Sequence, residues 1–130
     1  MLKHFQKLFK HLFQQQLREI KSMKPAKLDF KKINQEAMAL FATLVRRWLP
    51  NGSLVGREWV PCNPTRNDRT PGSFFINLDN GCFYDFATSE GGRGAIALYA
   101  YINKVSYYEA AKFLVKELHY NSEKKGGGNA

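Results

Sequence analysis

The chain lacks most of the features that mark secreted and membrane proteins. Its 130 residues include only two cysteines, and these are not in a C-x-x-C pair, which excludes a disulfide-rich scaffold. We expect Cys62 and Cys82 to be free thiols in a reducing cytoplasm, although their spacing also permits one bridge. No run of about 18 apolar residues exists, so no transmembrane helix is expected. The sequence also has no signal-peptide pattern.

The motifs of common enzyme classes are missing as well. The eleven acidic residues are scattered singly, with no Asp-x-Asp pair and no Gly-x-x-x-x-Gly-Lys-Ser/Thr loop. The histidines are His4, His11 and His119, and none belongs to a Ser/His/Asp arrangement. We therefore expect no catalysis from this chain alone and no cofactor.

Positive charge is abundant but unevenly placed. The net charge is +9, and residues 1–32 hold nine lysines and arginines against Glu19 and Asp29, so this arm carries +7 and residues 33–130 carry +2. Such a basic arm indicates a polyanionic partner, either a nucleic acid or an acidic protein surface.

The arm has the period of an amphipathic helix. Apolar residues recur at steps of three and four until Pro25, and they are Phe5, Leu8, Phe9, Leu12, Phe13, Leu17 and Ile20. The helix is expected to pack either on the domain or on a second copy of the chain. In the second case residues 1–24 would form the contact of a homo-oligomer. Docking on another protein stays open, as does a membrane-surface or transit role, since residues 1–18 contain no acid.

Beyond the arm, the pattern predicts a domain over residues 33–120 and a disordered tail over residues 121–130. A helix is expected from Asn34, as N-cap, to Leu49, then a strand over residues 54–60. Asn80-Gly81 predicts a two-residue hairpin turn that pairs Leu78 with Phe83, and this places Phe74, Ile76, Phe83 and Asp85 on one face. A turn at residues 89–95 leads into an apolar helix, and Ser106 with Glu109 forms a capping box for the last helix. The expected core includes the last two helices and Trp48, Trp59, Phe74, Phe83 and Phe86.

Between these elements, residues 63–74 read N-P-x-R-x-D-R-T-P-G-S-F, and residues 85–94 read D-F-A-T-x-x-G-G-R-G. This order, with a hairpin between and an apolar helix after, resembles the zinc-binding domain of bacterial replicative primases. It is closer still to the metal-free form at the front of phage and plasmid primase–helicases. The resemblance covers residues 54–118 and implies an α+β fold. It predicts a small antiparallel zinc-ribbon-like sheet of about three strands, packed with C-terminal helices and preceded by two N-terminal helices.

The resemblance places four residues of this chain where the zinc ligands would be: Asn63, Arg66, Asp85 and Thr88. Arginine stays protonated and cannot ligate zinc, so no structural zinc is predicted. We expect an Arg66–Asp85 pair to close the loop in its place, with Asn63 and Thr88 bonding nearby backbone.

The resemblance to the primase family implies that this domain binds single-stranded template. The cationic and aromatic residues of this chain suit such binding. The candidates for nucleic-acid binding are Arg57, Trp59, Arg69, Tyr84 and Arg93. Residues 89–94 could seat a phosphate at a helix N-terminus, or form only a tight turn. Trp59 could equally belong to the core, and Arg69 could be a loop-surface charge.

Two functions remain open. The first is a cytoplasmic, nucleic-acid-binding accessory subunit from a phage or mobile element, which holds single-stranded DNA or RNA beside a separate primase, polymerase or helicase. The second is a protein-interaction module whose arm docks on such an enzyme, recruiting or inhibiting it.

Overall fold

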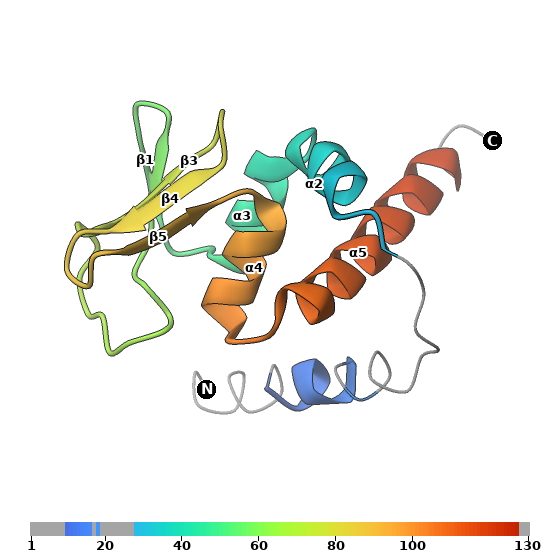
Figure 1. The fold of residues 1–130 in the computed structure, drawn as a ribbon. Coiled ribbons are helices and arrows are strands. Elements are labelled where there is room, and N and C mark those ends of the chain that lie inside the picture. Colours follow the sequence, from blue (N-terminus) through green and yellow to red (C-terminus); the bar gives the residue numbers. More distant parts are fainter. Residues whose placement is uncertain (1–9, 17, 19–27, 128–130) are drawn as a thin grey trace.

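The structure is a computed structural model that describes residues 10–16, 18 and 28–127. Residues 10–16 are helical, and the elements after residue 28 are α2 (Phe30–Met38), α3 (Phe41–Trp48), β1 (Ser53–Val55), β2 (Glu58–Val60), β3 (Phe74–Asn77), β4 (Cys82–Asp85), β5 (Glu90–Arg93), α4 (Ala95–Asn103) and α5 (Tyr107–Gly127). The sheet lies on one side of the molecule and the helices on the other (Figure 1). The predicted α+β class is confirmed.

The region predicted as one helix from Asn34 to Leu49 is instead two helices. Asp29, not Asn34, caps α2, because its side chain accepts a hydrogen bond from the Lys32 N–H at 3.1 Å. The chain tightens where Leu40 N–H donates to the Ala37 carbonyl at 3.0 Å, and α3 starts at Phe41. Asn34 lies inside α2, where its side-chain oxygen accepts from Ile96 N–H of α4 at 3.0 Å.

The sheet has five antiparallel strands in the order β1-β2-β3-β4-β5, rather than about three. The segment predicted as one strand, residues 54–60, is the β1–β2 hairpin, with Gly56 at a positive φ of 62° in its turn. The glycine-rich segment predicted as a turn forms β5, which pairs Tyr84 with Gly91 and Cys82 with Arg93. The two additional strands therefore come from a predicted strand that turns back at Gly56 and from a predicted turn that pairs with β4.

The β3–β4 hairpin forms at the predicted place but in a different register. Ile76 pairs with Phe83, so the loop is four residues long and the pairing of Leu78 with Phe83 was wrong. Asn77 stabilises this longer loop, because its side-chain oxygen accepts from Asp79 N–H at 2.9 Å and Asn80 N–H at 3.0 Å. A shift of two residues preserves the faces, since side chains alternate with a period of two.

The inner face of the sheet packs with the helices in one core. Phe74, Ile76 and Phe83 are buried there with Leu44 and Leu98. Tyr101 of α4 joins sheet and helices, with its ring centroid 5.9 Å from Phe74 and 5.5 Å from Phe83. Phe86 is not part of this core, contrary to expectation. It comes two residues after the outward-facing Tyr84 of β4, so it lies on the same outer side, and it is 69% exposed.

The last helix is longer than predicted. The capping box is present: Glu109 N–H donates to Ser106 Oγ at 3.1 Å and Ser106 N–H to Glu109 Oε2 at 3.4 Å. The helix α5 continues to Gly127, into the segment expected to be a disordered tail, while residues 128–130 lie outside the described residues. In the described ranges, no helix has the length and apolarity needed to cross a bilayer.

The described part of the arm packs on the domain. Phe13 stacks on Phe113 of α5 with 5.6 Å between ring centroids and 7° between ring planes. Leu12 on the same helix is 51% exposed. The rest of the predicted arm helix, residues 1–9, 17 and 19–24, lies outside the described residues.

Candidate functional site

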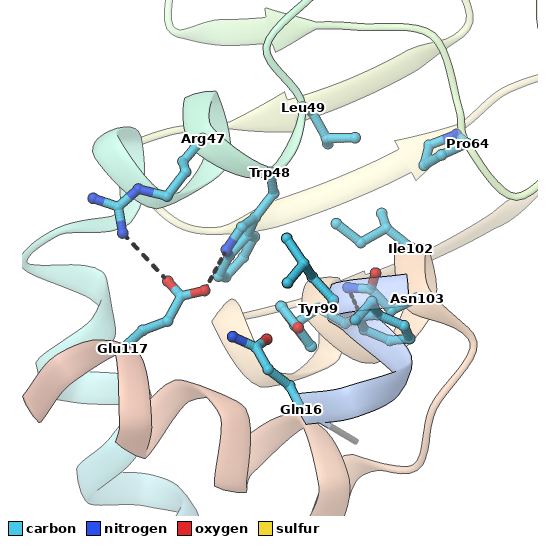
Figure 2. A pocket seen from close by; sticks show the side chains of 11 residues that line it. Gln16, Arg47, Trp48, Leu49, Pro64, Tyr99, Ile102, Asn103 and Glu117 are labelled. Atoms are coloured by element: carbon cyan, nitrogen blue, oxygen red, sulfur yellow. Dashed lines mark hydrogen bonds and ion pairs between the residues drawn. The ribbon is translucent and has the colours of Figure 1, made fainter. Parts of the chain in front are cut away.

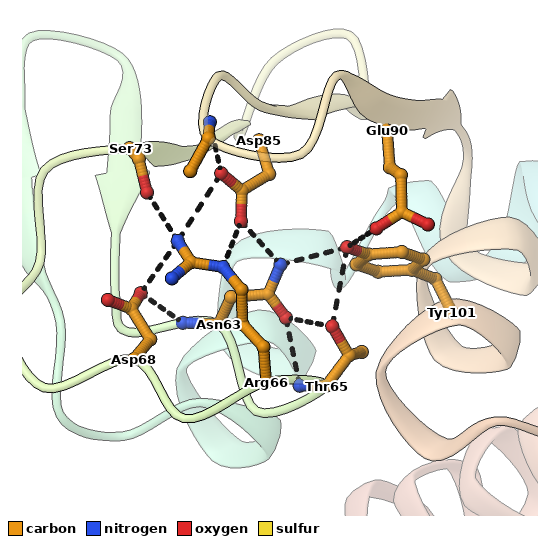
Figure 3. A network of polar contacts seen from close by, with 9 residues as sticks. Asn63, Thr65, Arg66, Asp68, Ser73, Asp85, Glu90 and Tyr101 are labelled. Carbon is orange, nitrogen blue, oxygen red and sulfur yellow. Dashed lines mark hydrogen bonds and ion pairs between the residues drawn. The ribbon is translucent and has the colours of Figure 1, made fainter.

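A buried carboxylate, Asp85, lies at the end of β4 and organises the loop between β2 and β3 (Figure 3). Its Oδ2 accepts from Asn63 Nδ2 at 2.7 Å and from Arg66 Nε at 3.0 Å. Its Oδ1 accepts from Ala87 N–H at 2.8 Å and from an Arg66 terminal nitrogen at 3.4 Å. Both oxygens are therefore satisfied, which a fully buried carboxylate requires.

Arg66 holds several loop segments together with its guanidinium. Besides Asp85, it donates to Ser73 Oγ at 2.6 Å, and it lies 3.4 Å from Asp68 Oδ2. Asp68 Oδ2 in turn accepts from Asn63 N–H at 2.8 Å. The loop thus closes on β4 through side chains that cross-link its start, middle and end.

Asn63 is buried and connects the same carboxylate to helix α4. Its amide nitrogen donates to the Tyr101 hydroxyl at 2.8 Å, and that hydroxyl donates to Glu90 Oε1 at 3.0 Å. Its side-chain oxygen accepts from Thr65 N–H at 2.9 Å and from Thr65 Oγ1 at 2.7 Å. We name this set of side chains the Asp85 network; it consists of Asn63, Thr65, Arg66, Asp68, Ser73, Asp85, Glu90 and Tyr101.

The network keeps Asp85 ionised. Burial alone would raise the pKa of its carboxyl, but hydrogen bonds from Arg66, Asn63 and Ala87 N–H outweigh burial and lower the pKa to about 2. The hydrogen bond to Asp85 also raises the pKa of Arg66. Both side chains of the pair are therefore charged at neutral pH.

Three of the four predicted residues come together, and one does not. Arg66 and Asp85 pair as expected, while Asn63 bonds the carboxylate and the Tyr101 hydroxyl as well as nearby backbone. Thr88 has an exposed side chain, and only its backbone N–H takes part, donating to the Asp85 carbonyl at 3.3 Å. Tyr101 and Glu90 were missed, because they reach the site only through the placement of α4 and β5.

These residues do not fit a zinc ion. An amide, a guanidinium and a single carboxylate replace thiolates and imidazoles, and both carboxylate oxygens already accept hydrogen bonds. Across the described residues, no group of three or more His, Cys, Asp or Glu side chains could hold a metal. Cys62 and Cys82 are both free thiols.

A second feature is the outer face of the sheet, which the helices leave uncovered. Three aromatic side chains gather on it: the ring centroid of Phe86 lies 4.9 Å from Tyr84 and 5.7 Å from Phe75. Phe86 is 69% exposed and Tyr84 is 39% exposed. Beside them is a hollow of about 410 Å³, and among its lining residues are Phe75, Tyr84, Phe86, Glu58, Asn77 and Asn80. Alternation along β4 could have identified Phe86, since Cys82, Tyr84 and Phe86 are two residues apart.

The residues predicted to bind a strand do not all lie on this face. Tyr84 does, and so does Arg93, which pairs with the outward-facing Cys82. Arg57 pairs with Asp79 at 2.9 Å beside the β3–β4 loop, and Arg69 is exposed in the loop before β3.

Trp59 was left open between strand binding and the core, and the structure places it in the core. Its side chain is buried, its indole N–H donates to the Leu49 carbonyl at 2.9 Å, and Arg46 lies over its ring at 5.1 Å. Trp59 is therefore a core residue that no base can stack on.

The phosphate-binding site predicted at residues 89–94 is not available, because the backbone groups of this segment are already hydrogen-bonded. Residues 90–93 are paired to β4, and the Gly94 N–H donates to the Gly81 carbonyl at 3.0 Å. At the start of α4, Asn34 accepts from Ile96 N–H, and Ala95, Ile96 and Ala97 are buried. Of that segment, only the Arg93 side chain faces solvent as a cation.

A cavity of about 330 Å³ lies between helical residues 10–16 and helices α3, α4 and α5 (Figure 2). There the indole N–H of Trp48 donates to Glu117 Oε1 at 3.1 Å, and Glu117 Oε2 is buried 3.8 Å from Arg47. Burial raises the pKa of Glu117, and Trp48 and Arg47 offset only part of that effect. None of the predicted site residues lines this cavity, which marks the joint between arm and domain.

Comparisons with known proteins agree with this architecture. Residues 51–129 match the family described as CHC2 zinc finger. The fold is similar to the crystal structure of the zinc-binding and RNA polymerase domains of the Aquifex aeolicus primase, with a TM-score of 0.60 and 26% identity. That match covers 72% of this chain but only 22% of the primase chain. No curated protein matches the sequence.

Proposed function

The chain belongs to the CHC2 zinc finger family and is thereby related to DNA primases, and from this we propose that it is a nucleic-acid-binding accessory subunit of a priming or replication complex. It would hold single-stranded template on the outer face of the sheet, beside a separate primase, polymerase or helicase that performs the chemistry. The likeness of its loop to the metal-free domains of phage and plasmid primase–helicases supports an origin in such an element.

The observation that carries this proposal is the exposed aromatic group on the outer face. Phe86 is 69% exposed and groups with Tyr84 and Phe75, and a cluster of exposed apolar rings of this kind is typical of a binding surface. Single strands are bound by stacking bases on aromatic side chains, with cations nearby for the phosphates. Arg93, at the edge strand next to β4, supplies such a cation.

Fluorescence anisotropy with a labelled single strand of mixed sequence tests the proposal. Phe86→Ala and Tyr84→Ala should each weaken binding of the strand by about 1–3 kcal/mol, the range found for the loss of one stacked base. Affinity should also fall as salt rises, since counterions compete for the phosphate contacts.

Tyr107→Ala is the matched control, because Tyr107 is also an exposed aromatic, 58% accessible, at the start of α5. It should leave the affinity unchanged, and circular dichroism should show that all three variants fold. Equal affinities for the wild type, Phe86→Ala and Tyr84→Ala would rule out the outer face as the binding surface.

A further inference from the structure

We propose that two copies of this chain associate through the free edge of β1, so that their two sheets continue as one. The inference goes beyond the proposed function and does not depend on strand binding. β1 stands at the end of the strand order, and among the described residues only β2 pairs with it. All three of its residues are exposed, including Leu54 at 53% and Val55 at 57%. An unprotected apolar edge of this kind is a template for pairing with another strand.

The backbone groups of Leu54 point to that free edge. The Arg57 carbonyl accepts from Leu78 N–H at 3.0 Å, so Arg57 bonds towards β3. Backbone groups alternate between the two sides of a strand, so the next residue, Glu58, bonds towards β1, where its partner is Val55. By the same alternation the N–H and carbonyl groups of Leu54 are turned away from β2. They can therefore exchange two hydrogen bonds with an antiparallel strand placed beside the sheet.

The strand matches itself about Leu54, which favours a second copy as the partner. When two copies of β1 run antiparallel about a two-fold axis, Leu54 of each copy meets Leu54 of the other, and the two residues exchange both hydrogen bonds. Gly52 and Gly56 lie at equal distances on either side of Leu54, so no side chain stands at the ends of the contact. No charged residue lies between these glycines, and the nearest one in sequence, Arg57, pairs with Asp79 of its own copy at 2.9 Å. The arrangement therefore brings no like charges together along the strand.

The opposite edge of the sheet differs in its side chains. β5 has Glu90 and Arg93 at its two ends and only glycines between them. A strand added at that edge would meet charged residues and would find no apolar side chain to pack on. Sheets commonly protect their edges with charges of this kind. The contrast identifies β1 as the edge that is open to association.

The dimer has its two outer faces on one side. The two-fold axis of an antiparallel strand pair stands perpendicular to the sheet, so residues that meet across the axis point to the same face. The outer face of one copy then continues as the outer face of the other. Two aromatic groups, each formed by Phe75, Tyr84 and Phe86, share this surface.

Sedimentation equilibrium of the full chain without nucleic acid, at protein concentrations up to the millimolar range, tests the proposal. The strand is short and the interface small, so the wild type should dimerise weakly, with a measurable monomer–dimer equilibrium. Leu54→Lys should raise the dissociation constant at least about tenfold, because two lysines then stand directly opposite each other. Leu12→Lys is the matched control, since Leu12 is an equally exposed leucine, at 51%, on the arm. It should leave the dissociation constant unchanged.

A mixture of Leu54→Lys with Leu54→Glu gives a result that a folding defect cannot imitate. Each variant alone should be monomeric, because like charges face each other at the axis. In the mixture opposite charges meet there, so a heterodimer of the two variants should form. Circular dichroism should show that both variants fold.

Three results would overturn the proposal. The first is a wild type that stays monomeric at every concentration. The second is a dimer that Leu54→Lys leaves intact or that Leu12→Lys removes, since the contact would then lie elsewhere. The third is a mixture of the two folded Leu54 variants that remains monomeric, since Leu54 would then not face its counterpart.

Discussion

Two side chains of one loop reach the carboxylate of Asp85, and each makes a different kind of contact. Arg66 brings the opposite charge, while Asn63 brings a neutral N–H and links onward to Tyr101. A buried ion pair is often no more stabilising than an apolar pair, but losing one partner leaves the other without compensation. The stability of the closed loop therefore depends on Asp85 keeping its charge.

Asp85→Asn should lower the free energy of unfolding by about 3 kcal/mol at neutral pH, because Arg66 loses its charged partner and one of the two acceptor oxygens becomes a donor. Chemical denaturation measures this change. Asp79→Asn is the control, since Asp79 forms an exposed ion pair with Arg57 and should cost less than about 1 kcal/mol. Equal losses in the two variants would show that the network does not stabilise the fold.

The lowered pKa of Asp85 also sets a pH dependence. The folded-state pKa of about 2 lies below the ordinary value of 3.8, so the folded state prefers the charged form. The contribution of Asp85 to stability is then complete above about pH 4 and is lost as the pH falls towards 2. Unfolding experiments across this window should show a steeper loss in the wild type than in Asp85→Asn. Parallel curves for the two proteins would contradict the assignment.

At the level of elements, β5 is shaped by its glycines. A Cβ on Gly91 would lie 2.5 Å from the Phe83 carbonyl oxygen and 2.7 Å from Tyr84 Cδ2, and one on Gly92 would lie 2.8 Å from Phe83 Cζ. The strand can therefore pair with β4 only because it has no side chains at these positions. The pairing in turn orders β4, which carries Asp85 on one face and Tyr84 on the other.

Gly91→Ala should lower the free energy of unfolding by about 1–3 kcal/mol, because the added methyl group meets backbone that must shift. Thermal or chemical unfolding measures the loss. Arg93→Ala, two residues along the same strand, removes an exposed side chain and should change stability by no more than about 0.5 kcal/mol. A Gly91→Ala protein as stable as Arg93→Ala would mean that β5 is not packed in this way.

Local patterns predicted elements well where a single signal acted alone. Asn80-Gly81 marked the hairpin and Ser106 with Glu109 marked the start of α5, because both depend on neighbouring residues. The register of the hairpin could not be read, since Asn77 stabilises a four-residue loop that competes with the two-residue turn. Residues 54–60 concealed a turn at Gly56, and residues 34–49 concealed a break before α3, because neither segment contains proline.

The same reasoning explains what could be predicted of the sites. Arg66 and Asp85 stood out because opposite charges occupy positions that the family uses for zinc. Tyr101 and Glu90 could not be found from the sequence, since contacts between distant segments depend on how α4 lies against the sheet. Phe86 was wrongly placed in the core because its alternation with Cys82 and Tyr84 was not used, and Trp59 was left open between core and surface because composition does not say which face of a strand is inward.

At the level of the whole molecule, the sheet separates two roles. Its inner face, with the helices, forms the core, and its outer face carries the aromatic group and the hollow. The Asp85 network joins the loop before β3 to the end of β4 and to α4, which is the kind of closure that a bound metal provides in small zinc domains. The central claim is that these side chains hold the fold together without such an ion.

Refolding in the presence of a chelator tests this claim most directly. The tag-free protein is denatured, then refolded either with excess chelator or with zinc, and its aromatic circular dichroism is recorded. We expect the same native spectrum under both conditions, because every contact in the network is made by the chain itself. A native spectrum that returns only with zinc would contradict the account.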